Sequence, residues 1–163
     1  MNQEISFYET VNKGKNGEEI FEEDFLKPLK IKYQNVTKCQ QFQIIDTDFG
    51  SIAGRYEIKL SYNDDNFICI EDWSNYNLDF GEQKLGWWYT TEADVVIFIS
   101  KVTRMMILLP INEIAKRHYE NIKEKYELIK NRVSFAKNYK WQSAFRKVSL
   151  EDFGGHYLIY QKK

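Results

Sequence analysis

The sequence is poor in several residues on which common structural classes depend. It has 2 cysteines, Cys39 and Cys69, and 2 histidines, His118 and His156. These are too few for a disulfide scaffold, a closed zinc site or a histidine-rich metal site. The 8 glycines and 2 prolines exclude a collagen-like or linker-dominated chain. No apolar run approaches ~18 residues, and the first residues lack the apolar core of a signal peptide. We therefore expect no membrane contact and a reducing, cytoplasmic compartment.

What the chain does contain is the composition of an ordinary globular protein. Apolar residues make up 43% of its 163 residues and charged residues 29%, a balance that excludes an intrinsically disordered chain. A chain of this length can bury a substantial core and has the usual size of one domain. We therefore predict a single domain over residues 1–163.

Charge is divided unequally along the chain, although the net charge is only −1. Residues 1–100 carry 9 Lys and Arg against 18 Asp and Glu, whereas residues 101–163 carry 14 against 6. Such asymmetry indicates contact with nucleic acid or a membrane surface, although a basic segment is more often a solvated helix. In residues 116–147, 10 basic residues alternate with aromatic ones, which suits a phosphate-tracking surface and equally suits core contacts. The candidate nucleic-acid-binding residues are Lys116, Arg117, Lys137 and Lys140.

The hydrophobic pattern of the first half predicts a helix followed by strands. Residues 17–29 carry apolar side chains at helical spacing, and Pro28 predicts that this helix ends near Lys27. Its apolar positions are Ile20, Phe21, Phe25 and Leu26. Three strands are predicted after it, at residues 41–49, 55–61 and 67–71. The short turns between these strands indicate an antiparallel meander.

The second half adds two strands and a long helix. Residues 93–100 form an apolar, β-branched run typical of a central strand covered on both faces, and residues 104–109 are its expected neighbour. A helix is predicted from Ile111 to about Lys130, within a basic helical region of about 111–147. Its expected buried positions are Ile114, Tyr119, Ile122, Tyr126 and Ile129. This order of elements predicts an α/β or α+β fold in which helices flank a central mixed sheet.

A cluster of acidic residues around two of the predicted strands carries the strongest chemical signal. Asp46 and Asp48 close one strand, and Glu57 and Lys59 share a face of the next. Because paired strands lie ~4.8 Å apart, we expect the Asp48 and Glu57 carboxylates to lie within roughly 6 Å of each other. Converging carboxylates repel unless a cation lies between them, and their hard oxygens suit Mg²⁺ or Mn²⁺. A Glu-x-Lys pair alone is more often a solvated ion pair.

The spacing Asp-x(8)-Glu-Ile-Lys, from Asp48 to Lys59, resembles the active-site signature of the PD-(D/E)XK nuclease superfamily. Glu18 or Glu22, on the helix before the aspartate strand, resembles the usual opening of its small phage-type and resolvase-like members. Three further stretches follow in the family's order: FICIEDWSN, GWWYTTEADVVIFIS and MMILLPINEI. The resemblance covers roughly residues 15–130. One departure is that no proline precedes Asp48.

The resemblance implies a restriction-endonuclease-like core and a Mg²⁺-dependent DNA endonuclease, acting on branched or phage DNA. In such an enzyme Asp48 and Glu57 hold the metal, Lys59 orients the attacking water or stabilises charge on the phosphate, and Glu18 or Glu22 completes the site. Asp46 is the alternative to Asp48, which we prefer because Asp46 can serve only to cap the turn. Family members often dimerise to cut two strands, so a homodimer is expected by analogy. Two alternatives are a nuclease-fold protein that binds DNA or protein without cutting, and an accessory protein of a phage or mobile element whose acidic cluster is only surface.

Several other residues have both a functional and a structural interpretation. Glu71 ends the third predicted strand and is either a ligand for metal or DNA or an exposed carboxylate. We expect Asp94 to make a structural hydrogen bond. Trp87 and Trp88 are expected in the core rather than beside DNA. Cys69 is expected to be a small buried apolar residue.

Overall fold

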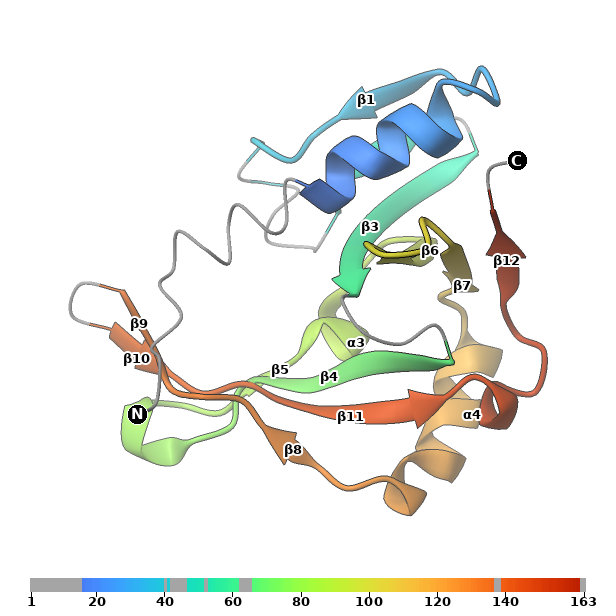
Figure 1. The fold of residues 1–163 in the computed structure, drawn as a ribbon. Helices are drawn as coiled ribbons and strands as arrows, with labels where there is room; N and C mark the ends of the chain where they lie inside the picture. The colour runs from blue at the N-terminus through green and yellow to red at the C-terminus, as the bar shows by residue number, and fades with distance from the viewer. Residues whose placement is uncertain are drawn as a thin grey trace.

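The protein has a mixed α/β fold in which a central mixed sheet lies between helices and a second sheet (Figure 1). The computed structural model describes residues 16–39, 41, 47–51, 53–61, 66–136 and 139–161. Within these ranges, no helix is both long and apolar enough to cross a lipid bilayer.

The central sheet brings together strands from both halves of the chain. Its order is β1 (Tyr33–Asn35), β2 (Phe49–Ser51), β3 (Gly54–Ser61), β6 (Val95–Ser100), β7 (Met106–Pro110) and β12 (Leu158–Tyr160). β3 and β6 are parallel, and every other neighbouring pair is antiparallel. A parallel pair needs a long crossover connection, and here residues 62–94 make it.

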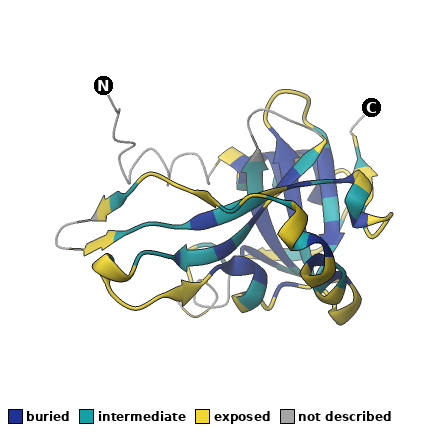
Figure 2. Cartoon of the chain, turned by 90° about the horizontal axis from the view of Figure 1, so that it is seen from below, coloured by how far each residue is buried: buried dark blue, intermediate teal, exposed yellow. Residues whose placement is uncertain are grey.

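That crossover and the C-terminal part of the chain build a second, antiparallel sheet. Its order is β5 (Lys84–Leu85), β4 (Phe67–Asn75), β11 (Ala144–Ser149) and β8 (Ile129–Lys130). A separate hairpin joins β9 (Ser134–Ala136) to β10 (Tyr139–Trp141). The hairpin lies at one end of the second sheet and α4 (Glu113–Ile122) at the other, in both ribbon views (Figures 1 and 2).

Helices cover both faces of the central sheet. The N-terminal helix is α-helical over residues 16–21 and π-helical over Glu22–Leu26. Short helices complete the fold: α3 (Trp87–Thr90) and the 3-10 turns η2 (Leu78–Phe80), η3 (Lys123–Lys125) and η4 (Glu151–Phe153). The N-terminal helix packs on the face of β3 that carries Tyr56 and Ile58. On the opposite face, α3, α4 and the second sheet enclose the larger core, and Figure 2 shows the buried residues concentrated in these layers.

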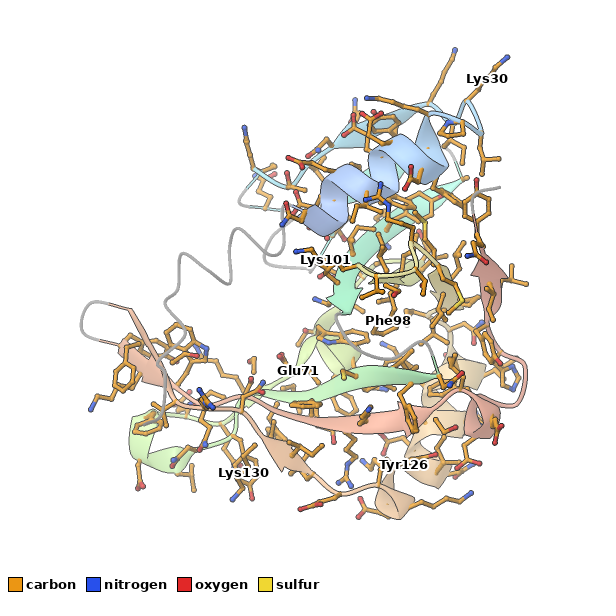
Figure 3. The ribbon with its side chains drawn as sticks, in the orientation of Figure 1. Lys30, Glu71, Phe98, Lys101, Tyr126 and Lys130 are labelled. Atoms are coloured by element: carbon orange, nitrogen blue, oxygen red, sulfur yellow. The ribbon has the colours of Figure 1, made fainter. Side chains whose placement is uncertain are left out.

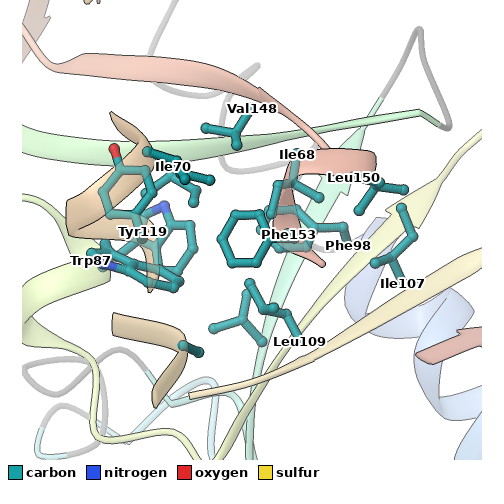
Figure 4. Close-up of a cluster of buried hydrophobic side chains, with 14 residues drawn as sticks. Ile68, Ile70, Trp87, Phe98, Ile107, Leu109, Tyr119, Val148, Leu150 and Phe153 are labelled. Carbon is teal, nitrogen blue, oxygen red and sulfur yellow. The ribbon is translucent and has the colours of Figure 1, made fainter. Parts of the chain in front are cut away.

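The larger core explains why β6 and β7 are so apolar. Val96 and Phe98 of β6 and Ile107 and Leu109 of β7 belong to it, together with Trp88 of α3. Figure 4 shows Phe98, Ile107 and Leu109 in this cluster. Alternate residues of β6, Ile97 and Ile99, enter the smaller core under the N-terminal helix. A strand buried on both faces needs apolar residues at every position rather than at alternate ones.

Several sequence predictions are confirmed. The N-terminal helix gives way to a turn at Lys27, and its four predicted apolar positions are all buried. β6 and β7 are antiparallel neighbours, and β6 is covered on both faces. Trp87 and Trp88 are buried in the core. Asp94 makes its structural hydrogen bond by accepting from the Arg55 backbone N–H at 2.7 Å.

Other predictions are wrong, because partners distant in sequence decide the outcome. β4 does not continue a meander from β3 but pairs with β11 and β5 in the second sheet. The long helix is limited to α4, and the expected helical region of about 111–147 is mostly strand and loop after Lys125. Ile114 and Ile129 are 66% and 37% exposed, and Cys69 is exposed on β4.

Candidate functional site

The backbone of β3 fixes Asp48 in place. Asp48 lies directly before β2, and its N–H donates to the Tyr56 carbonyl oxygen at 2.8 Å. Its carboxylate Oδ2 accepts from the Ile58 N–H, also at 2.8 Å. Both contacts are made to the strand that carries the other candidate residues, and Asp48 is only 9% exposed. The carboxyl group is therefore held beside β3 with little freedom to rotate away.

Glu57 and Lys59 lie beside this aspartate. They are two residues apart on β3 and so share one face of the strand. Glu57 is 6% exposed, its carboxylate pairs with the Lys59 ammonium, and its side chain is hydrogen-bonded to that of Asp48. Asp48 and Glu57 are thus neighbours beside β3, and their role as a metal-holding pair stays a prediction.

Burial is the main influence on the protonation of Asp48. It raises the pKa of the Asp48 carboxyl above its usual value, and the negative charge of Glu18 raises it further. The Ile58 N–H and the Lys59 ammonium oppose this rise in pKa, because both stabilise the charged carboxylate. The site therefore concentrates negative charge where little water can screen it.

The N-terminal helix contributes Glu18 rather than Glu22. Gly17 lets the helix approach β3 closely, because a Cβ there would lie 3.3 Å from side-chain atoms of Ile58 and Leu60. Glu18 follows directly, close enough for its charge to act on Asp48. Glu22 instead accepts a hydrogen bond from the Tyr33 hydroxyl at 2.5 Å, which lowers the Glu22 pKa.

A cleft of about 700 Å³ opens beside Lys59. It lies between β3 on one side and β4, β5 and α3 on the other, and is lined by Lys59, Glu71, Ser74, Lys84, Leu85, Trp87 and Thr90. The Lys59 Nζ lies 5.4 Å from the centroid of a Trp87 ring, a cation–π contact that helps to hold the ammonium at the cleft wall. Glu71, on β4 near α3 (Figure 3), is thus a cleft residue.

Gly86 shapes this cleft by allowing α3 to touch β4. A Cβ at Gly86 would lie 2.1 Å from the backbone oxygen of Glu71, which is far inside van der Waals contact. The Gly86 N–H also donates to the Asp72 carbonyl oxygen at 2.8 Å. The absence of a side chain at Gly86 therefore sets the position of Trp87, and with it the wall of the cleft.

We expect Gly86→Ala to lower the free energy of unfolding by about 1–3 kcal/mol, the usual cost of overpacking. The clashing atom belongs to the backbone, so relief requires α3 or β4 to move. Gly50→Ala is the matched control, because a Cβ at Gly50 would meet no atom within 4 Å. Chemical denaturation of both variants measures the difference. Equal stability of the two would show that α3 does not depend on this contact.

The described candidate nucleic-acid-binding residues lie on two separate elements of the fold. Lys116 and Arg117 lie on α4, whereas Lys140 lies on β10, at the opposite end of the second sheet (Figure 1). Lys137 lies outside the described residues, as does Asp46, the alternative to Asp48. In the described part of the chain, residues 116–147 are divided among α4, η3, β8 and the β9–β10 hairpin, and their role as a phosphate-tracking surface stays a prediction.

Sequence reasoning missed most of the cleft wall. Lys84 and Thr90 were not singled out, and the core tryptophan Trp87 also lines the cleft. Both residues belong to the crossover between β3 and β6. The hydrophobic pattern around them does not indicate that they lie beside β3. The available signal was the glycine at position 86 directly before two tryptophans, since such a glycine often marks close backbone approach.

No family model, no curated protein and no solved structure matches the chain. In the described part of the chain, no group of three or more His, Cys, Asp or Glu side chains forms a metal-holding cluster. The candidate metal ligands are therefore two carboxyl groups, those of Asp48 and Glu57.

Proposed function

We propose that the protein is a metal-dependent DNA endonuclease of the PD-(D/E)XK type, with a restriction-endonuclease-like core. The observation that carries this proposal is the contact of the buried Asp48 and Glu57 carboxyl groups, with Lys59 paired to Glu57 at the wall of a cleft. The mixed sheet, with helices on both faces, is compatible with the proposed core. This site agrees residue by residue with the Asp-x(8)-Glu-Ile-Lys signature.

The donor set fits a hard divalent cation. Mg²⁺ usually keeps several waters and takes only one or two protein carboxylates together with substrate phosphate. Asp48 and Glu57 offer two buried carboxyl groups at one point, and the nearby charge of Glu18 adds negative potential. These two residues would hold Mg²⁺ or Mn²⁺. When bound, the ion would polarise the phosphodiester and lower the pKa of a coordinated water.

Lys59 has the position needed to act on the substrate. Its side chain is 28% exposed and reaches the cleft, whereas its partner Glu57 is buried behind it. The ammonium can therefore donate a hydrogen bond to a phosphate oxygen in the cleft without leaving the site. A cation fixed before the reaction stabilises the charge that develops on phosphate. The Ile58 N–H, meanwhile, donates to Asp48 Oδ2 and so orients this carboxyl group for the proposed metal.

A cleavage assay on duplex, single-stranded and branched DNA tests the proposal. We expect cleavage of at least one substrate with Mg²⁺ or Mn²⁺ and none with EDTA, because the two carboxylates need the metal to act. Asp48→Asn should abolish cleavage. Glu92→Gln is the matched control, since Glu92 is a surface carboxylate paired with Arg55 at 3.0 Å. DNA binding without cleavage under any metal condition would instead support the non-cutting alternative.

A further inference from the structure

Two aromatic rings, one exposed and one half-buried, form a stack on the β9–β10 hairpin. Tyr139 and Trp141 are two residues apart on β10 and so lie on the same face of the strand. Their ring centroids are 5.7 Å apart, with an angle of 22° between the planes. Tyr139 is 46% exposed. Rings of this kind usually lie in a core or mark a binding surface when they remain exposed.

The stacked pair forms one wall of a hollow that leads towards the candidate site. The hollow measures about 370 Å³ and is lined by Ser74, Asn75, Lys84, Tyr139 and Trp141. Ser74 and Lys84 also line the larger cleft that contains Lys59. The two spaces therefore adjoin each other at Ser74 of β4 and Lys84 of β5.

Hydrogen bonds fix the hairpin relative to β4. The Tyr76 N–H donates to the Gln142 carbonyl oxygen at 2.7 Å, and the Gln142 N–H donates to Asn75 Oδ1 at 3.3 Å. The Asn75 amide in turn donates to the Glu82 carbonyl oxygen at 2.9 Å. The aromatic stack is thus anchored to the strand that also carries Glu71 of the cleft.

Basic side chains accompany the aromatic rings at this end of the molecule. Lys130, at the hairpin end of the second sheet (Figure 3), places its Nζ 4.6 Å from the Tyr76 ring centroid. Lys84 is exposed on β5, beside the hollow. Cations alternating with aromatic faces suit a ligand that alternates phosphates with planar bases.

We propose that Tyr139 and Trp141 are a stacking platform for bases of an unpaired DNA strand, and that the hollow guides this strand into the cleft. A base in a duplex is stacked and paired, whereas a base in a single strand presents its face to aromatic side chains. The platform thus selects DNA with a single-stranded region next to the bond that is cut. This inference rests on the proposed nuclease function and names the substrate class of its site.

Binding measured without divalent metal tests the platform apart from catalysis. The probes are a fluorescently labelled single-stranded oligonucleotide and a blunt duplex of the same sequence. We expect Trp141→Ala to weaken single-strand binding about 5- to 100-fold, the range for loss of one base-stacking side chain, and to change duplex binding less than 2-fold. Trp141→Phe should restore most of the affinity. Phe135→Ala is the matched control, because Phe135 is as exposed as Tyr139, at 46%, but lies on the opposite face of the hairpin.

The outcomes separate this inference from the proposed function. Loss of single-strand affinity in Trp141→Ala, with retention in Trp141→Phe and Phe135→Ala, supports the platform whether or not the protein cuts DNA. Equal losses for single strand and duplex, equal losses in Phe135→Ala, or no loss would each overturn it. Metal-dependent cleavage by a protein whose binding ignores Trp141 would leave the nuclease proposal intact and remove the platform. Tryptophan fluorescence provides a second readout, since stacking on Trp141 should quench it.

Discussion

Lys59→Met is expected to slow metal-dependent DNA cleavage by about 100- to 1,000-fold, the usual effect of removing one preorganised group that stabilises transition-state charge. Methionine keeps the apolar stem against Trp87 and removes only the ammonium. Lys59 is the cation paired with the buried Glu57 carboxylate, so its loss should also lower the free energy of unfolding, by less than the about 3–5 kcal/mol typical of a fully buried pair. DNA affinity should remain within a few-fold, because one of several cationic contacts is lost.

Single-turnover cleavage at saturating DNA is the appropriate measurement, since it separates chemistry from binding and product release. Lys27→Met is the matched control, because Lys27 is also paired with a carboxylate, Glu23, but on the surface of the N-terminal helix. An unchanged cleavage rate in Lys59→Met would remove this residue from the mechanism. A parallel loss in both lysine variants would point to a general charge effect.

Asp72→Ala is expected to destabilise the protein by about 3–5 kcal/mol, the usual cost of removing one partner of a buried ion pair. The Asp72 carboxylate accepts from the Tyr119 hydroxyl at 2.5 Å and from Arg146 Nε at 2.8 Å. It therefore joins β4 to α4 and β11 inside the larger core. Without Asp72, the Arg146 guanidinium would remain 12% exposed with its main counter-charge removed.

Urea denaturation measures this loss, with Glu92→Ala as the control. Glu92 also pairs with an arginine, but in solvent, and its removal should cost less than about 1 kcal/mol. The double variant Asp72→Leu/Arg146→Met should recover much of the stability, because an apolar pair can replace a buried ion pair at little net cost. Similar stabilities of the two single variants would show that the buried pair contributes no more than a surface one.

The parts of the site that the sequence predicts are those set by short-range rules. Alternation along a strand places Glu57 and Lys59 on one face, and a tight antiparallel connection brings Asp48 beside them. The helical spacing of Phe21, Phe25 and their apolar neighbours likewise predicts which face is buried. Each of these inferences involves residues close in sequence, for which geometry leaves few options.

The remaining parts depend on contacts between distant segments. The pattern of β4 alternates and would suit either sheet, and only pairing with β11 decides which one it joins. The helix predicted to reach about Lys130 stops early because Arg146, from β11, donates to the carbonyl oxygens of Lys123 and Tyr126 at 2.9 and 2.6 Å. The carbonyl oxygens just beyond the helix thus accept hydrogen bonds from a side chain of a distant strand. The sequence near the helix end does not indicate this partner.

The crossover between β3 and β6 has a consequence for the order in which the protein folds. The β2–β3 pair, which holds Asp48 against Glu57, is local and can form early. The parallel β3–β6 pair must wait until residues 62–94 close a loop, and the same loop supplies the opposite wall of the cleft. The carboxylate pair can therefore exist in a partly folded chain, whereas the cleft beside it forms only on completion of folding. In the proposed nuclease, the acidic centre would thus form before the cleft that is proposed to receive DNA.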